Sequence, residues 1–322
     1  MAGEAPALPP TDVSRMPSHQ RLAFALLAVL LVVAPFLAYP VFLMKALCFA
    51  LYASAYNLLL GYAGLVSFGH AAFLGSAAYV TAHSAKVWGL PTELAILAGT
   101  ATATTLGLIF GLLAIRRQGI YFAMITLALA QMIFFFCLQA PFTGGEDGIQ
   151  AVPRGRLLGI VDLNSNLAMY GFVATVCFAA FLLIHRIVHS PFGQVLKAIR
   201  ENEPRAISLG YRADRYKLLA FVISAGLSGL AGSMKALVFQ LASLSDVHWS
   251  MSGEAVLMTL VGGLGTIFGP LVGALTIVTM QNYLAHFGAW VTIVQGVIFV
   301  VCVMAFRRGI VGEISRRLRL PF

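Results

Sequence analysis

The sequence predicts an all-α fold: a polytopic integral membrane helical bundle of about ten membrane segments, some half-helical or re-entrant. Three observations lead to this fold class. The 322 residues are 60% hydrophobic and 10% charged, whereas soluble domains carry about 25% charged residues. Many apolar runs approach the roughly 20 residues that a helix needs to cross a hydrocarbon core. These runs also lack the alternating polarity of transmembrane strands.

The apolar runs set the predicted domain organisation. We expect a flexible N-terminal tail over 1–20, a membrane domain over 21–306 and a basic cytoplasmic tail over 307–322. The run over 252–266 is short and interrupted by glycines, so we expect a half-helical or re-entrant element there. The ten predicted segments are 22–39, 41–60, 65–85, 93–115, 119–140, 167–189, 217–241, 252–266, 268–285 and 287–306.

The basic residues predict the orientation of these segments. With the N-terminus inside, 16 of the 21 Lys and Arg residues fall in inner loops and tails, which is the bias that orients membrane helices. Both termini are then cytoplasmic, and the net charge of +9 reflects membrane orientation rather than binding to nucleic acid. An inner loop over about 190–216 and an outer loop over about 141–166 are long, while the other loops are short.

Enzyme motifs are missing from the sequence. There is no GxxxxGK[ST] phosphate loop, no HExxH, no GxSxG and no CxxC pair. The cysteines at 48, 137, 177 and 302 all lie in apolar runs, as small buried side chains do. We therefore expect no catalytic residue, no cofactor and no metal site.

The inner loop is longer than a connection between two spans requires. Pro191 and Gly193 end the preceding span, and 195–203 can form a short helix of mixed polarity. Pro204 begins a second short helix that ends at Gly210. Two interpretations remain open for this loop: a docking element for a cytoplasmic partner, or a solvated basic loop held by lipid headgroups.

Several stretches resemble one known family. They are 56–64 (YNLLLGYAG) with 67–73 (SFGHAAF), 117–129 (RQGIYFAMITLAL), 143–148 (TGGEDG), and 190–193 (SPFG) followed by 198–203 (AIRENE), 209–210 (LG) and 216–221 (YKLLAF). Residues 254–273 also look like this family. Together these stretches resemble the LivM-like permeases, the membrane subunits of ATP-binding-cassette (ABC) importers for branched-chain amino acids.

The resemblance implies a heteromeric importer in the bacterial inner membrane, in contact with membrane lipid. A second related permease would complete a heterodimer, two cytoplasmic ABC ATPase subunits would drive it, and a periplasmic binding protein would deliver the solute. The absence of a phosphate loop fits an ATPase located on a partner. The inner loop matches the region that couples such permeases to the ATPase, with candidate residues Pro191, Phe192, Gly193, Lys197, Arg200, Glu201, Glu203, Arg205 and Gly210.

Two further sets of candidate residues are predicted. Polar groups within spans could line a pathway or bond a neighbouring helix: Asn57, Ser67, Thr126, Gln131 and Thr259. The outer loop could dock the binding protein or form an ordinary solvated turn, through Thr143, Gly144, Gly145, Glu146, Asp147 and Gly148.

The leading functional prediction is an ABC importer permease for branched-chain or other hydrophobic amino acids. Urea or a short amide is the alternative within the same architecture, because neutral pathway groups suit a zwitterion and a neutral polar solute equally. An ion-coupled secondary transporter or channel is the alternative from another class, and it requires a buried ionisable residue for coupling. Glu254 is the best candidate for that residue.

Overall fold

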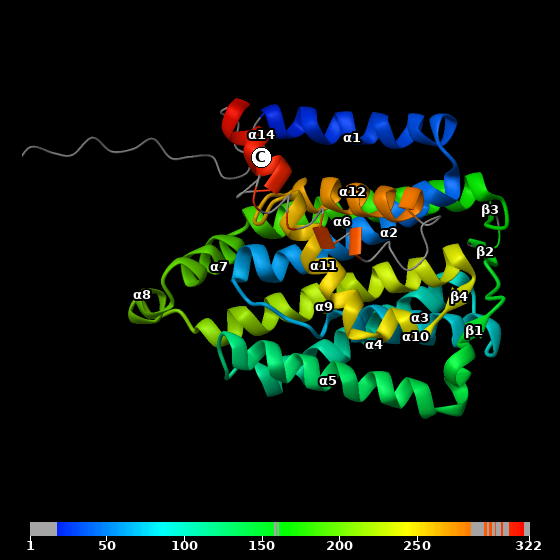
Figure 1. The fold of residues 1–322 in the computed structure, drawn as a ribbon, viewed down its shortest axis with the longest axis horizontal. Coiled ribbons are helices and arrows are strands. Elements are labelled where there is room, and N and C mark those ends of the chain that lie inside the picture. Colours follow the sequence, from blue (N-terminus) through cyan, green and yellow to red (C-terminus); the bar gives the residue numbers. More distant parts are fainter. Residues whose placement is uncertain are drawn as a thin grey trace, which may run out of the picture.

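The computed structural model describes residues 18–157, 159, 161–284, 293–294, 296–297, 300, 304 and 309–318. Long helices run roughly side by side between two ends of the molecule (Figure 1). One end carries the short helices α7 and α8, and the other carries four two-residue strands (Figure 1). The predicted tail over 1–17 and most of the tenth predicted segment lie outside the described residues.

The first half of the bundle contains six long helices. Helix α2 continues directly into a π-helix, η1, so the two form one long span. Glycine residues end η1 and begin α3, and no regular structure connects them over 64–69. The elements are α1 (Ser18–Leu37), α2 (Pro40–Asn57), η1 (Leu58–Ala63), α3 (His70–Lys86), α4 (Thr92–Ala114), α5 (Ile120–Gln139) and α6 (Asn166–His189).

The second half contains the longest helix, α9, and the two halves of an interrupted helix, α11 and α12. Residues 263–268 separate α11 from α12, so the expected interruption near 252–266 is present. The elements are α7 (Pro191–Glu201), α8 (Glu203–Ser208), α9 (Ala213–Phe239), α10 (Leu244–Val247), α11 (Trp249–Gly262), α12 (Gly269–Leu284) and α14 (Gly309–Leu318).

Each of the nine predicted segments before residue 286 coincides with a described helix. Within the described residues, five helices are long and apolar enough to cross a bilayer, judged by length and composition alone: Pro40–Ala63, Thr92–Ala114, Ile120–Gln139, Asn166–His189 and Ala213–Phe239. Helices α3, α11 and α12 have 17, 14 and 16 residues and fall below that length. The chain is therefore an all-α, multi-pass membrane bundle whose helices differ widely in length.

Small residues bring the central helices together. Helix α9 packs against α3 and α4, and a methyl group at Gly99 of α4 would lie 2.5 Å from Ser233 Oγ. At Gly232 of α9, the backbone carbonyl group of Leu74 occupies the place of a side chain. Close backbone contact through small residues is how helices associate in lipid, where hydrophobicity gives no driving force between them.

The outer helices carry apolar side chains on their exposed face as well as on the face buried in the bundle. On α5, Phe122, Thr126, Ala130 and Cys137 are buried, whereas Met124, Met132, Phe135 and Phe136 are exposed. This pattern is the reverse of a soluble bundle, in which the exposed face is polar. It matches a helix that has protein on one side and hydrocarbon on the other.

The end of the bundle that carries the strands, which we call the strand end, is held together by short strand pairings that the apolar pattern did not predict. β1 (Ile149–Gln150) pairs antiparallel with β4 (Leu241–Ala242), and β2 (Arg156–Leu157) pairs with β3 (Val161–Asp162). The buried guanidinium of Arg154 donates to the carbonyls of Leu237 and Val238 at the end of α9. A cation is favourable there because the last carbonyls of a helix have no partner within the helix.

Candidate functional site

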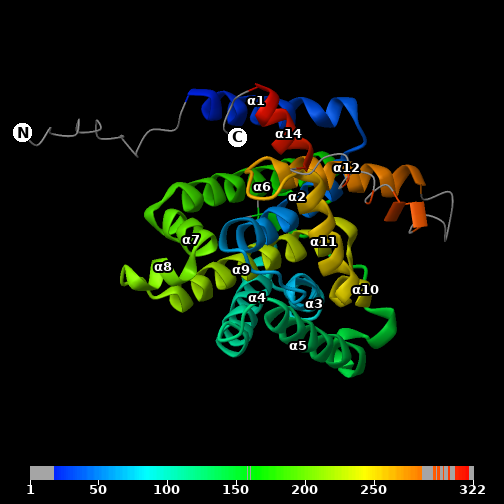
Figure 2. The same cartoon turned by 60° about the vertical axis from the view of Figure 1, so that its left-hand side comes forward.

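Residues 190–212, which we call the arm, form a helical projection beyond the end of the bundle (Figures 1 and 2). Ser190 caps α7, because its hydroxyl accepts from the Gly193 amide at 3.4 Å. Asn202 caps α8, with its side-chain oxygen 3.1 Å from the Arg205 amide. Each cap is followed by a proline in the first turn, where a missing N–H costs nothing. The predicted pair of short helices is therefore present, with α7 beginning at Pro191 rather than at residue 195.

The base of the arm is fixed to α9. Ile199, Ala206 and Ala213 form a small buried cluster of their own. Glu203 Oε1 lies 2.6 Å from Lys217 Nζ, with the two side chains 19% and 5% exposed. These contacts join α7 and α8 to the start of the long helix α9.

The tip of the arm exposes large apolar side chains. Ile207, Leu209 and Tyr211 are 55%, 70% and 41% exposed, and Gly210 between them has a φ of +92°. The tip lies beyond the end of the bundle in Figure 2, and its neighbours Glu201 and Arg205 are exposed charges. Exposed apolar residues beside charges are features of both protein-binding and membrane-binding surfaces. The sequence pattern singled out Gly210 but not the three apolar side chains around it.

Two glycine breaks lie beside the arm, each with one glycine against Arg200: Gly64 in the first and Gly265 in the second. The first break is 64–69, between η1 and α3, and the second is 263–268, between α11 and α12. Asn57 ties the second break to α2, because its side chain accepts from the Gly265 amide at 3.0 Å and donates to the Thr266 carbonyl at 2.8 Å. Arg200 of α7 donates to the carbonyl of Gly61, in the last turn before the first break.

A cavity of about 260 Å³ lies between α7 and these breaks, lined by Gly61, Tyr62, Lys197, Arg200, Glu201 and Gly265. The Lys197 ammonium stands 5.6 Å from the centre of the Tyr62 ring, within the range of a cation–π contact. Partial burial lowers the pKa of Lys197 below 10.5, and the nearby Glu201 carboxylate opposes that shift. The cavity therefore separates the arm from the bundle at a polar, charged surface.

The remaining coupling candidates serve the arm's own structure. Phe192 stacks on Tyr216 of α9 with ring centres 5.8 Å apart. Gly193 faces the Ile187 carbonyl so closely that a methyl group there would lie 2.6 Å from it. Within the candidate set, Lys197, Arg200 and Glu201 line the cavity between the arm and the bundle, and Arg200 also donates to the Gly61 carbonyl.

Four of the five pathway candidates are buried and hydrogen-bonded inside the bundle. Thr126 accepts from the Phe68 amide at 3.2 Å, and Ser67 accepts from the Gly69 amide at 3.1 Å. Thr259 donates to the Ala255 carbonyl at 2.6 Å, and Asn57 ties the second break as described above. Gln131 is half-buried on α5. Three of these side chains hold the glycine breaks, which are irregular backbone at the ends of spans.

Ser252 belongs with this group, although the sequence analysis did not single it out. Its hydroxyl accepts from the Ala71 amide and donates to the Phe68 carbonyl, both at 2.8 Å. It thereby connects α11 to the first break. An isolated serine in an apolar helix carries no sequence signal for such a contact, because the partner lies more than 180 residues away.

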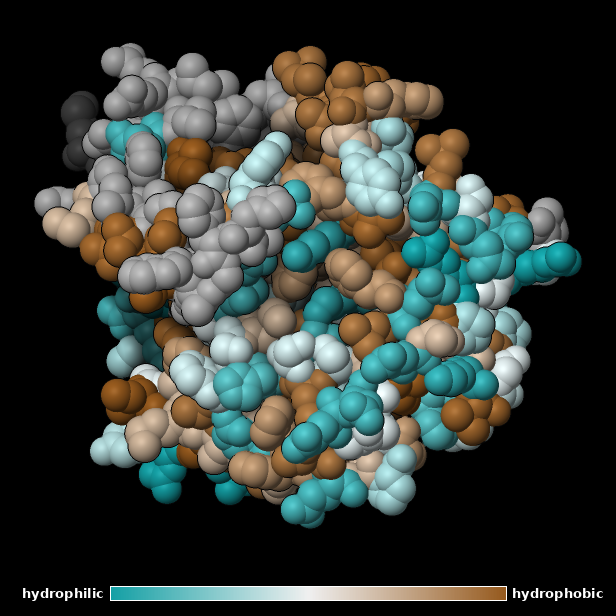
Figure 3. Space-filling model, turned by 45° about the vertical axis from the view of Figure 1, so that its right-hand side comes forward, coloured by the Kyte–Doolittle hydropathy of each residue, from teal (hydrophilic) through white to brown (hydrophobic). Residues whose placement is uncertain are grey.

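The outer-loop candidates lie at the opposite end, near the strands. Glu146 and Asp147 are exposed, while Thr143 is buried and donates to the Cys137 carbonyl at 2.5 Å. Gly148 rests against the Ala242 carbonyl, which leaves no space for a side chain. In Figure 3, which brings this end forward, hydrophilic residues gather over it beneath the hydrophobic flank of α1. The loop is thus a fixed, acidic feature of this end.

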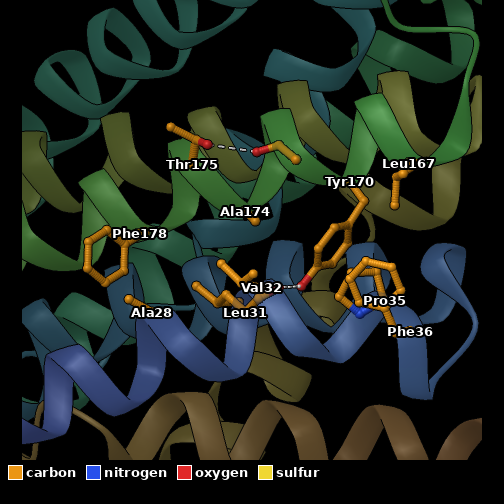
Figure 4. Close-up of a pocket in the computed structure, with 11 residues that line it drawn as sticks. Ala28, Leu31, Val32, Pro35, Phe36, Leu167, Tyr170, Ala174, Thr175 and Phe178 are labelled. Atoms are coloured by element: carbon orange, nitrogen blue, oxygen red, sulfur yellow. Dashed lines mark hydrogen bonds between the residues drawn. The ribbon is translucent and has the colours of Figure 1, made fainter.

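A groove of about 460 Å³ between α1 and α6 has a different character (Figure 4). Its lining is almost wholly apolar, with Leu31, Phe36 and Phe178 among the side chains that face it. Tyr170 donates to the Leu31 carbonyl and Thr175 to the Gly171 carbonyl, both at 2.7 Å. Because both hydroxyls donate within the protein, the groove suits hydrocarbon rather than a polar solute.

Helices of bilayer length, interrupted helices that meet at glycine breaks, and a polar arm outside the bundle together define a multi-pass membrane permease. Comparison with known proteins makes the assignment more specific. The chain belongs to the family described as branched-chain amino acid transport system / permease component, whose family model matches residues 40–303.

Several curated relatives share this sequence pattern. The high-affinity branched-chain amino acid transport system permease protein LivM of Escherichia coli is 25% identical over 287 residues, which cover 82% of this chain and 68% of the relative. A probable LivM of Methanocaldococcus jannaschii is 25% identical over 58% of this chain and 54% of its own. The ribose import permease protein RbsC of Bacillus subtilis is 28% identical over 56% and 58%. No solved structure matches the chain.

Proposed function

We propose that this chain is the permease subunit of an ABC importer that moves branched-chain or other hydrophobic amino acids across a bacterial inner membrane. It pairs with a second related permease, two cytoplasmic ATPase subunits drive it, and a periplasmic binding protein delivers the solute. Membership of the permease family and the similarity to LivM over 82% of the chain support this proposal. Hydrolysis of ATP belongs to the partners.

The arm is the observation that carries the proposal. It is a rigid, capped pair of helices with an apolar tip, and it joins both α9 and the glycine breaks. Such a structure suits docking on an ATPase that changes shape, because a rigid lever transmits displacement. The candidate residues from Pro191 to Gly210 act as this coupling element. Glu146 and Asp147, at the opposite end, contact the binding protein.

The solute is a separate question from the architecture. The similarity to a ribose import permease indicates that related sequences serve different polar solutes. Asn57, Ser67, Thr126, Gln131 and Thr259 are neutral, so they suit an amino acid zwitterion as well as urea or an amide. We assign amino acids because both LivM relatives are named as branched-chain amino acid transport permeases.

Uptake of labelled leucine, urea and ribose by cells with and without the gene tests the proposal. Leucine uptake that requires both the gene and cellular ATP supports the amino acid importer. Loss of urea or ribose uptake alone would support the same ABC architecture with a different transported solute. Gene-dependent uptake that survives ATP depletion and requires a proton gradient contradicts the ABC mechanism.

A further inference from the structure

Three segments that are distant in sequence meet at the arm end of the bundle. They are the last turn of η1 at Gly61, the second break at Gly265, and α7 at Arg200. Arg200 donates to the Gly61 carbonyl, and Asn57, one helical turn earlier, holds Gly265 and Thr266. A continuous chain of hydrogen bonds and backbone therefore runs from the arm through η1 and α2 to the turn between α11 and α12.

The fit of Arg200 and Asn57 around η1 and the second break depends on the absence of side chains at three positions. A methyl group at Gly64 would lie 3.0 Å from Arg200 Cγ, and one at Gly265 would lie 3.3 Å from Arg200 Nη1. A methyl group at Gly61 would lie 2.7 Å from the Gly265 amide nitrogen and would also collide with the Asn57 side chain. The arginine thus occupies a space that Gly64 and Gly265 leave open, while Gly61 leaves room for the contact between Asn57 and Gly265.

The chemistry of the contact between Arg200 and Gly61 suits the transmission of movement from α7 to η1 rather than packing alone. The final carbonyls of a helix have no intrahelical partner, so the Gly61 oxygen is free to accept a hydrogen bond from outside. A guanidinium donor makes this bond charge-assisted and directional. Arg200 is an exposed residue overall, and the 260 Å³ cavity that it lines leaves space between α7 and η1.

We propose that Arg200 is the positioning residue that transmits displacement of the arm to the two glycine breaks. Movement of α7 then shifts the Gly61 end of η1, and Asn57 carries that shift to the turn between α11 and α12. Interrupted helices are natural hinges, since their backbone is not locked by continuous helical bonding. This inference rests on the proposed function, because it assigns the route by which ATPase movement reaches the spans.

Arg200→Gln in the complex purified from its native host through a tag on this chain tests the route. The number of leucine molecules transported per ATP hydrolysed, measured in proteoliposomes with the binding protein, is expected to fall at least tenfold, while the complex purifies intact. Arg200→Lys keeps the charge and most of the reach, so it restores part of the ratio. Arg215→Gln, an exposed arginine at the start of α9, is the matched control.

A double-variant experiment distinguishes transmission from a structural role. If Arg200 and Asn57 act in one chain, the transport ratio of Arg200→Gln with Asn57→Ala falls no further than that of either single variant, because coupled residues are non-additive. The inference would be overturned if the two substitutions lowered the transport ratio multiplicatively. It would also be overturned if Arg200→Gln left the ratio unchanged, or if that variant failed to purify with its partners. A wild-type complex without ATP-dependent uptake would instead contradict the proposed function.

Discussion

Lys217 and Glu203 show how much of the arm depends on single side chains. The Lys217 side chain is only 5% exposed, and the Glu203 carboxylate 2.6 Å away is its ion-pair partner. An ion pair withdrawn from water adds little net stability compared with apolar replacements, but removing one partner leaves the other as an uncompensated buried charge. Glu203 is therefore a structural support for the arm as well as a coupling candidate.

Glu203→Gln is expected to lower the free energy of unfolding by about 3 kcal/mol, because it leaves the Lys217 ammonium without its counter-charge. Chemical denaturation of the purified protein in detergent measures this loss. Asp214→Asn, at an exposed acid on α9, the helix that carries Lys217, serves as the control and is expected to change stability by under about 0.5 kcal/mol. Equal stability of the two variants would contradict a buried, paired role for Glu203.

At the scale of single residues, the sequence singled out candidate side chains but could not predict which of them contact one another. Asn57 and Arg200 were both singled out, one as a pathway residue and the other as a coupling residue. Their meeting around Gly61 and Gly265 could not be predicted, because it joins positions more than 130 residues apart. Composition, periodicity and local spacing contain no information about such contacts.

The helices themselves were largely predictable from apolar periodicity and breaker residues. Pro191 begins α7 and Gly210 follows the end of α8, as the breaker residues predict, but Gly193 lies inside α7 rather than at a boundary. Pairing of Ile149 with Ala242 was not predicted, because two-residue strands are too short for a period-2 pattern to register. The π-helix was also missed, since its sequence resembles any apolar α-helix.

A substitution at the apolar tip tests whether the arm binds the ATPase subunits. Leu209→Asp places a charge on a side chain that is 70% exposed, so the fold tolerates it while an apolar contact does not. We expect about tenfold weaker binding of the ATPase subunits, the effect of losing one apolar anchor at an interface. Val161→Asp, at the strand end, is the matched control at 43% exposure. Co-purification at graded salt measures the effect, and unchanged recovery of ATPase with Leu209→Asp would count against docking at the tip.

Helix packing at α9 makes a second prediction at the element scale. Gly232→Ala forces a methyl group to within 2.8 Å of the Leu74 carbonyl carbon, so α3 and α9 must separate. Overpacking of this kind costs about 2 kcal/mol. Gly253→Ala on α11 meets no atom within 4 Å, so it is expected to be neutral or slightly stabilising. Thermal unfolding of both variants in detergent gives the comparison, and equal midpoints would refute the close α3–α9 contact.

At the scale of the whole molecule, the arm and the short strands occupy opposite ends of the bundle (Figure 1). This separation agrees with a chain whose inner and outer loops lie on different sides of a membrane. The described cysteines at 48, 137 and 177 are all buried, so they give little background for labelling experiments. With Cys302, which lies outside the described residues, replaced by serine, sidedness can be measured with single introduced thiols.

Ser208→Cys on the arm is expected to react with a membrane-impermeant maleimide only in inside-out vesicles. Asp162→Cys on β3 is expected to react only in right-side-out vesicles. Both original residues are exposed, so neither substitution disturbs packing. Labelling of both positions from one side would contradict the bundle's two-ended arrangement across the membrane, and exchanged sides would reverse the orientation that the basic residues predict.

Transport by purified protein in proteoliposomes tests the central claim most directly. This chain alone should transport no leucine, whereas the complex with the second permease, the ATPase subunits and the binding protein should accumulate leucine only when ATP is present on the arm side. Energy-independent leucine flux through vesicles that contain this chain alone would contradict the account and indicate a channel.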